Sequence, residues 1–154
     1  MEPARKEARY SRLFTQLQEL LNKTTDPDAR MATVAAVLHN KMECFYWTGF
    51  YMLVEGELTV RTYQGPLACQ VLTKHDGVCW AGIDRKETIV VPDIHKFPGH
   101  IACDSASKSE IVVPLKNKSG RITGVLDVDS KSFNSFDAVD AGWLEQIVDL
   151  IYQT

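Results

Sequence analysis

Apolar and polar residues alternate with the period of a helix over the first forty positions. From Arg5 to Leu21, apolar side chains recur three and four residues apart, with charged and amide side chains between them; they are Leu13, Leu17, Leu20 and Leu21. Asp26 and Pro27 then read as an N-cap and a first-turn proline. Apolar residues again follow at helical spacing: Met31, Val34, Ala35 and Leu38. The pattern predicts two N-terminal helices within residues 5–42.

Two later segments have the composition of β-hairpins. The run CFYWTGFYMLV, from Cys44 to Val54, is aromatic and β-branched, and the turn Glu55-Gly56 leads from it into LTVRTY. Farther along, EIVVPL is joined through KNKSG to RITGVLDVDS. We therefore expect an antiparallel sheet, with its loops, over residues 44–130.

The section between these hairpins, from Gln64 to Ser109, is interrupted by glycine and proline and reads as irregular. Loops on a rigid scaffold often carry functional sites, so we expect the site here. At the C-terminus, Ser135 is the expected cap of a helix over residues 136–152, with an apolar stripe made of Val139, Trp143, Ile147 and Leu150. The pattern predicts a single α+β domain, 1–154, whose helices pack on the antiparallel sheet.

Composition excludes several classes of protein. The 154 residues are 45% hydrophobic and 24% charged, which favours one self-sufficient core. A net charge of -3 with scattered Lys and Arg argues against a nucleic acid partner. The polar start MEPARKEARYSR and the lack of a long apolar run argue against secretion or membrane insertion, so we expect a cytoplasmic protein.

The four cysteines separate into two groups by their neighbours. Cys44 opens an aromatic, apolar segment and is expected to be a small buried hydrophobe. Cys69, Cys79 and Cys103 lie in or beside the irregular section, among small and polar residues. Burial is one interpretation of these three; the other is a redox role, because a turn exposes a thiol to backbone N–H groups that favour the thiolate.

A zinc site is a further alternative. Asp93, His95, His100 and Cys103 are suitable ligand types and lie close together in the sequence. However, the sequence contains no C-x-x-C or H-x-x-x-H pair, so the spacing argues against a structural metal and we expect none. The two histidines are interpreted instead as packing or hydrogen-bonding residues of a loop.

Carboxylates gather in the second hairpin. Asp127 and Asp129 are two apart in a strand and share a face, and Glu110 begins the partner strand near them. A solvated sheet face is the ordinary interpretation. The alternative is a cluster that holds an ammonium group or shares a proton, which suits a small amino-acid site. Trp47 and Tyr51 also share a strand face, either as a wall of such a site or as core.

Five segments together resemble a known family. YWTGFY, QGPLAC, GVCWAG, GHIACDSASKSEIVVPL and GVLDVDS occur in an order similar to that of the free methionine-(R)-sulfoxide reductases, over roughly Phe45 to Leu150. Those proteins are stand-alone GAF domains without a cofactor that reduce the R epimer of the free amino acid's sulfoxide, serve in the oxidative stress response and are recycled by thioredoxin. The resemblance implies that Cys103 is the nucleophile, that Cys69 resolves it through a disulfide, and that Cys79 joins alternative disulfides.

The resemblance also implies the residues of the substrate site. Glu110, Asp127 and Asp129 match the acidic residues and Trp47 the pocket aromatic, to which we add Tyr51 on the same strand face. Attack of a Cys103 thiolate on sulfur requires an acid at the sulfoxide oxygen, and Glu110 or Asp129 is the expected donor. Trp80 departs from the family pattern, in which a small residue follows the GVC cysteine. A GAF-type small-molecule sensor is the rival function, and the sequence leaves a monomer or a homodimer open.

Overall fold

The computed structural model describes residues 2–100 and 105–154. Its helices are α1 (Pro3–Leu21), α2 (Pro27–Lys41), α3 (Gly77–Arg85) and α4 (Ala138–Asp149), with a short 3-10 helix η1 (Ile94–Lys96). Its strands are β1 (Trp47–Val54), β2 (Glu57–Gln64), β3 (Val71–Leu72), β4 (Ile89–Val91), β5 (Ser109–Lys116) and β6 (Ile122–Ser130). The expected α+β class is confirmed.

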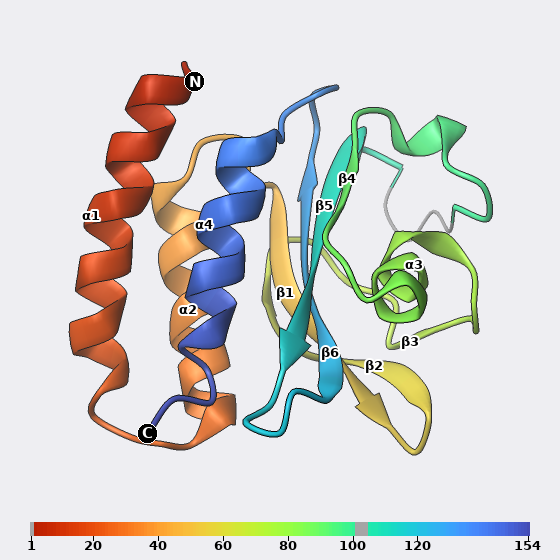
Figure 1. Cartoon of the computed structure of the whole chain (residues 1–154). Coiled ribbons are helices and arrows are strands. Elements are labelled where there is room, and N and C mark those ends of the chain that lie inside the picture. Colours follow the sequence, from red (N-terminus) through yellow and green to blue (C-terminus); the bar gives the residue numbers. More distant parts are fainter. Residues whose placement is uncertain (1, 101–104) are drawn as a thin grey trace.

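The strands form one antiparallel sheet in the order β3-β2-β1-β6-β5-β4 (Figure 1). Both expected hairpins, β1–β2 and β5–β6, are present, and their long inner strands β1 and β6 pair with each other at the centre. The short strands β3 and β4 occupy the two edges of the sheet. The sheet is therefore open rather than a closed barrel.

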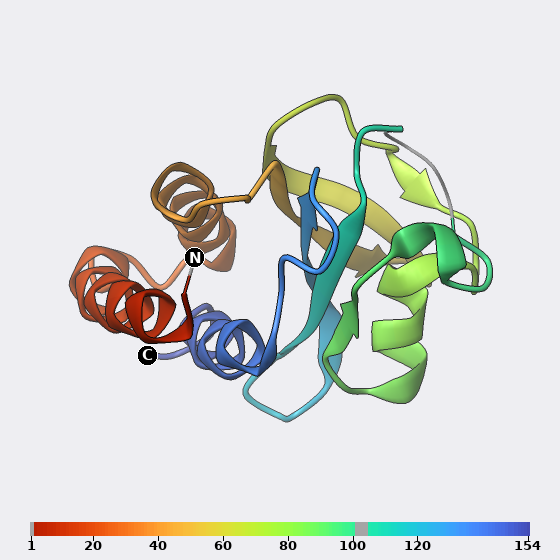
Figure 2. The same cartoon turned by 90° about the horizontal axis from the view of Figure 1, so that it is seen from above.

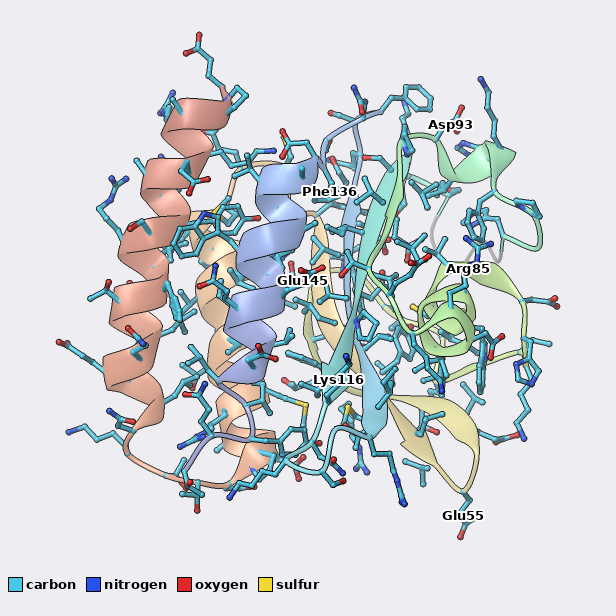
Figure 3. All side chains as sticks on the ribbon, in the orientation of Figure 1. Glu55, Arg85, Asp93, Lys116, Phe136 and Glu145 are labelled. Carbon is cyan, nitrogen blue, oxygen red and sulfur yellow. The ribbon has the colours of Figure 1, made fainter. Side chains whose placement is uncertain are left out.

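Helices cover the sheet unequally. α2 and α4 pack directly on one face, and α1 lies outside them, whereas α3 packs on the opposite face, on the same side as the short η1 (Figures 1 and 2). In Figure 3, Arg85 at the end of α3 and Glu145 of α4 lie on opposite sides of the sheet. The side chains of β1, β5 and β6 alternate between the two faces, so these three strands contribute both to the core under α2 and α4 and to the core under α3.

The two N-terminal helices follow the expected pattern with one exception. Asp26 caps α2 by accepting a hydrogen bond from the Asp28 N–H, as its sequence predicts. In α1, however, Leu20 is 43% exposed, whereas Tyr10 is fully buried. The inclusion of Leu20 in the buried stripe was therefore wrong, because Leu17 and Leu21 already fill the inward side of that last turn.

The middle section is more ordered than its glycines and prolines indicate. The segment GVCWAGIDR forms α3 although its two glycines weaken helix propensity, because the helix packs on β5 and β6. Gly82 permits this approach, since a Cβ atom there would lie 2.8 Å from Cγ1 of Val112. The expectation of an irregular segment was wrong at this helix.

Two further local expectations are corrected. The cap of α4 is Asp137 and not Ser135, and Asp137 forms a capping box with Asp140, so the helix spans 138–149. Cys44 is exposed, with a φ of 70°, in the turn before β1 rather than buried in a strand. Of the described helices, none is both long enough and apolar enough to cross a membrane.

Candidate active site

A pocket lies between the sheet and the N-terminal part of α3. The strands supply its floor, and α3 and the loops that precede β3 and β5 supply the rest. The described residues that line it are Trp47, Tyr51, Leu67, Ala68, Leu72, Asp76, Gly77, Val78, Cys79, Ile94, His100, Ser107, Glu110, Asp127 and Asp129. All the described residues that the sequence assigned to the substrate site therefore reach one cavity.

The sheet register brings the three carboxylates together. Glu110 of β5 lies directly opposite Asp129 of β6, and Asp127 follows two residues away on the same face. Glu110 is 8% exposed and Asp127 6% exposed, so the interpretation as a solvated face is wrong. The Oδ1 atom of Asp127 is buried without a hydrogen-bond partner, a costly state for a carboxylate oxygen.

Burial and mutual repulsion hold protons on this cluster. Burial raises the pKa of Glu110 well above its usual value, and the charges of Asp127 and Asp129 raise it further. Burial also raises the pKa of Asp127, opposed by hydrogen bonds from Glu110 and Cys79. Among the described lining residues there is no lysine or arginine. The pocket can therefore supply a proton or receive a cationic group.

Aromatic rings form the wall beside these carboxylates. Trp47 stacks on Tyr51, with ring centroids 5.7 Å apart, and on Tyr63, at 5.3 Å. The Trp47 indole donates to the carbonyl of Pro66 at 3.1 Å, and the Tyr51 hydroxyl donates to that of Cys69, also at 3.1 Å. The wall thus fixes the loop that carries Cys69.

Gly49 and Tyr63 are parts of this wall that the sequence reasoning missed. A Cβ atom at Gly49 would lie 2.4 Å from Cβ of Tyr63 and 2.7 Å from Cη2 of Trp47. Only glycine fits beneath the stacked rings at that position. The glycine inside the strand motif YWTGFY was the available signal, because an internal strand glycine often marks a close approach.

The cysteines occupy different environments. Cys79 is buried in α3 rather than exposed in a turn, which agrees with burial, one of the two interpretations that the sequence left open for it. Burial raises the pKa of its thiol, and the nearby charges of Asp127 and Glu110 raise it further. Cys69 lies outside the strands and helices, and its partly buried side chain packs against the core between the sheet and α3. Cys103 lies outside the described residues.

One group of described side chains has metal-ligand chemistry: the Sγ of Cys79 and carboxylate oxygens of Glu110 and Asp127 lie within 4.8 Å of one another. This group is not the one that the sequence suggested as an alternative. In that set, Nδ1 of His95 lies 3.2 Å from Oδ1 of Asp93, and the rings of His95 and His100 meet edge to face. These contacts agree with the interpretation of both histidines as loop residues.

Trp80, the departure from the family pattern, is accommodated away from the pocket. Its side chain is 3% exposed, and its indole donates to the carbonyl of Leu72 at 3.2 Å. The ring also contacts His75, at a centroid distance of 4.6 Å. Trp80 therefore joins α3 to the β3 edge of the sheet.

Comparison with known proteins identifies the family to which this chain belongs. A model of the GAF domain matches residues 24–153, and the free methionine-R-sulfoxide reductase of Escherichia coli is 38% identical over 139 residues, 90% of this chain and 84% of that protein. The chain belongs to the GAF-domain family of free methionine-R-sulfoxide reductases.

Two further proteins show the same likeness over nearly the whole chain. GAF domain-containing protein A of Dictyostelium discoideum is 47% identical over 147 residues, 95% of this chain and 92% of its own. The crystal structure of the Neisseria meningitidis free methionine-R-sulfoxide reductase, in complex with its substrate, is 39% identical. It superposes with a TM-score of 0.90 over 96% of this chain and 88% of that one.

Proposed function

We propose that this GAF domain reduces free L-methionine-(R)-S-oxide to methionine. The observation that carries the proposal is the unpartnered Oδ1 of Asp127, buried near Glu110 in a pocket whose neighbouring wall is aromatic. A buried acceptor without a donor calls for a ligand that brings one. The names of the Escherichia coli relative and of the Neisseria meningitidis complex support the choice of ligand.

The α-ammonium group of the free amino acid supplies that donor. It brings a positive charge and three N–H groups to a cluster that has no lysine or arginine among its described neighbours. A peptide-bound methionine sulfoxide has a neutral amide in place of this ammonium. We infer that the carboxylates select the free amino acid, while Trp47 and Tyr51 contact its side chain.

The reduction transfers one oxygen atom and two electrons. The Cys103 thiolate attacks the sulfoxide sulfur and forms an S–S bond, and the oxygen receives a proton from Glu110 or Asp129. The oxygen then moves to the cysteine sulfur as the S–O and S–S bonds break, so methionine leaves and Cys103 becomes a sulfenic acid. Because burial and neighbouring charges raise its pKa, Glu110 remains protonated closer to neutral pH than an ordinary carboxyl group, which supports its role as the acid.

The sulfenic acid is then resolved by a second thiol. Attack by the Cys69 sulfur forms a disulfide with Cys103 and releases water, and the dithiol of thioredoxin reduces that disulfide by exchange. The raised pKa of buried Cys79 disfavours its thiolate, which supports Cys69 as the resolving residue. Recycling by thioredoxin suits a reducing compartment, and we place the reaction in the cytoplasm.

The central experiment compares substrates. The pure protein is incubated with dithiothreitol and with each sulfoxide epimer, either free or N-acetylated, and the reduced product, methionine or N-acetylmethionine, is measured by chromatography. We expect product only from the free R epimer and none with Cys103→Ser, because a hydroxyl is a far weaker nucleophile. Equal turnover of the N-acetylated form would contradict ammonium recognition, and methionine binding without any turnover would indicate the rival sensor function.

A second experiment tests the resolving step with two matched variants. We expect Cys69→Ser to release about one methionine per protein and then to stop when thioredoxin is the reductant, because the sulfenic acid lacks its partner. Cys79→Ser should continue to turn over. The reverse result would assign resolution to Cys79, and full turnover by both variants would show direct reduction of the sulfenic acid.

A further inference from the structure

Ser107 presents a second unpartnered polar atom to the pocket. It is 4% exposed, it precedes β5, and its Oγ is buried without a hydrogen-bond partner. Of the buried side-chain nitrogen and oxygen atoms in the described residues, only this one and Oδ1 of Asp127 lack a partner, and both belong to residues that line the same cavity. Two such atoms in one place point to a ligand with two polar groups.

We propose that Ser107 and the N-terminus of α3 together bind the α-carboxylate of the substrate, an inference that rests on the proposed reductase function. In a free amino acid the carboxylate and the ammonium are attached to the same carbon atom. When the ammonium pairs with Asp127, the carboxylate must therefore lie within a few ångströms of a cluster of its own charge sign. It needs donors that face the cavity from another direction.

The other side-chain donors of the described lining residues are less suited to a carboxylate. The Trp47 indole and the Tyr51 hydroxyl already donate to the carbonyls of Pro66 and Cys69. Burial lowers the pKa of His100, and the neighbouring His95 lowers it further, which disfavours a cation there, and the described lining residues include no lysine or arginine. The Ser107 hydroxyl is distinguished from the other donors because it is buried without a partner.

The first turn of α3 supplies backbone donors beside it. Asp76, Gly77 and Val78 line the pocket, and Asp76 at the N-cap makes no side-chain cap hydrogen bond. Asp26 and Asp137 do cap α2 and α4. The first N–H groups of a helix lack intrahelical partners and attract anions. The Asp76 carboxylate is exposed, so water screens its repulsion of a bound carboxylate.

The test uses ligand pairs that differ only at the carboxylate. The affinities of the native protein, Ser107→Ala and the exposed neighbour variant Ser105→Ala for methionine and methioninamide are measured by calorimetry. We expect Ser107→Ala to weaken methionine binding by about tenfold to a hundredfold, the effect of one hydrogen bond to a charged group. It should weaken methioninamide binding much less, and Ser105→Ala should change neither.

Thermal unfolding separates binding from a structural role. Ser107→Ala removes a buried hydroxyl that lacks a partner, so the ligand-free variant should unfold at the same temperature as the native protein or above it. The rise in Tm caused by methionine should be smaller. A lower ligand-free Tm, or a loss of affinity equal for methionine and its amide, would overturn the subsite.

Steady-state kinetics keeps the two proposals distinct. With free methionine-(R)-sulfoxide, we expect Ser107→Ala to raise KM by a factor similar to the loss of affinity and to change kcat less than the Cys103 and Glu110 variants do. An unchanged KM would overturn the subsite while the reductase activity stands. A native protein that binds methionine with the Ser107 dependence but reduces no sulfoxide would overturn the reductase activity and leave the carboxylate subsite supported.

Discussion

The two sides of the central sheet differ in the partners of their buried charged side chains. On the side covered by α1, α2 and α4, Nζ of Lys6 in α1 lies 2.6 Å from Oδ2 of Asp140 in α4, and the Tyr10 hydroxyl donates to Oδ1 of Asp140 at 2.5 Å. On the α3 face, Glu110, Asp127 and Asp129 crowd together, and Oδ1 of Asp127 has no partner. Both sides bury carboxylates, but among the described residues Asp140 has a cation as a partner, whereas Oδ1 of Asp127 has no partner.

Arg30 is a second buried charged side chain with internal partners on the side of α1, α2 and α4. This buried guanidinium donates through Nε to the carbonyls of Leu21 and Thr24, at 3.1 and 2.7 Å. Through Nη1 it donates to carbonyls beyond the end of α4, including that of Leu150 at 2.9 Å. A buried charge with such contacts joins the connection between α1 and α2 to the segment after α4 and leaves little capacity for a ligand. The comparison indicates that the paired charges of Lys6 and Asp140 stabilise the fold, whereas the partnerless Oδ1 of Asp127 is available to a ligand.

The largest effect on stability is expected from removal of the cation of the Lys6–Asp140 pair. Lys6→Met leaves the Asp140 carboxylate buried without its cation, and removal of one partner of a buried pair costs about 3–5 kcal/mol. Urea denaturation should show this loss in the free energy of unfolding, whereas kcat/KM of the folded variant should not change. The exposed-lysine variant Lys23→Met is the control. A stability equal to that of the native protein would refute the distinction between the faces.

In the pocket, Asp127→Asn should have the opposite effect: it should lower activity and leave stability intact. Removing one of the clustered charges relieves repulsion, so the ligand-free protein should be at least as stable as the native one. The substrate ammonium group would lose its partner, so kcat/KM for the free sulfoxide should fall. The expected loss of transition-state stabilisation is about 2–5 kcal/mol. Asp149→Asn, at an exposed aspartate, is the matched control. Destabilisation without loss of activity would assign Asp127 to the fold.

A smaller effect should appear in the pH dependence of stability. Because the pKa of Glu110 is raised in the folded protein, the unfolded chain loses this proton first as pH rises above about 4.5. Its contribution therefore favours the folded state at low pH and is lost as pH rises through the raised folded-state pKa. The difference in unfolding free energy between Glu110→Gln and the native protein should grow in the variant's favour over this window. Glu19→Gln, at an exposed site, should give a flat difference.

The smallest effect is expected at the exposed thiol. Cys44 lies before β1 and outside the pocket, so Cys44→Ala should change the free energy of unfolding by less than about 0.5 kcal/mol and leave both half-reactions intact. Urea denaturation and turnover with thioredoxin provide the measurements. A marked fall in kcat without unfolding would show that Cys44 takes part in thiol exchange.

Local patterns in the sequence determined most of the secondary structure and the composition of the site. The periodicity of α2 and its Asp26-Pro27 start are complete within fifteen residues, and each hairpin is specified by two adjacent runs and a turn. The period of two also placed Asp127 and Asp129 on one face, and the hairpin brought Glu110 to them. Such features depend on contacts between near neighbours in the chain.

Tertiary packing decided what those patterns left open. α3 is a helix despite two glycines because β5 and β6 cover one of its sides, and this same contact buries Cys79 and the carboxylates of the sheet. Whether a strand face meets water or another element depends on residues far away in the chain. The periodicity of a segment predicts its secondary structure but not which elements pack against it. The burial that raises the pKa of Glu110 and leaves Oδ1 of Asp127 without a partner therefore follows only from the folded structure.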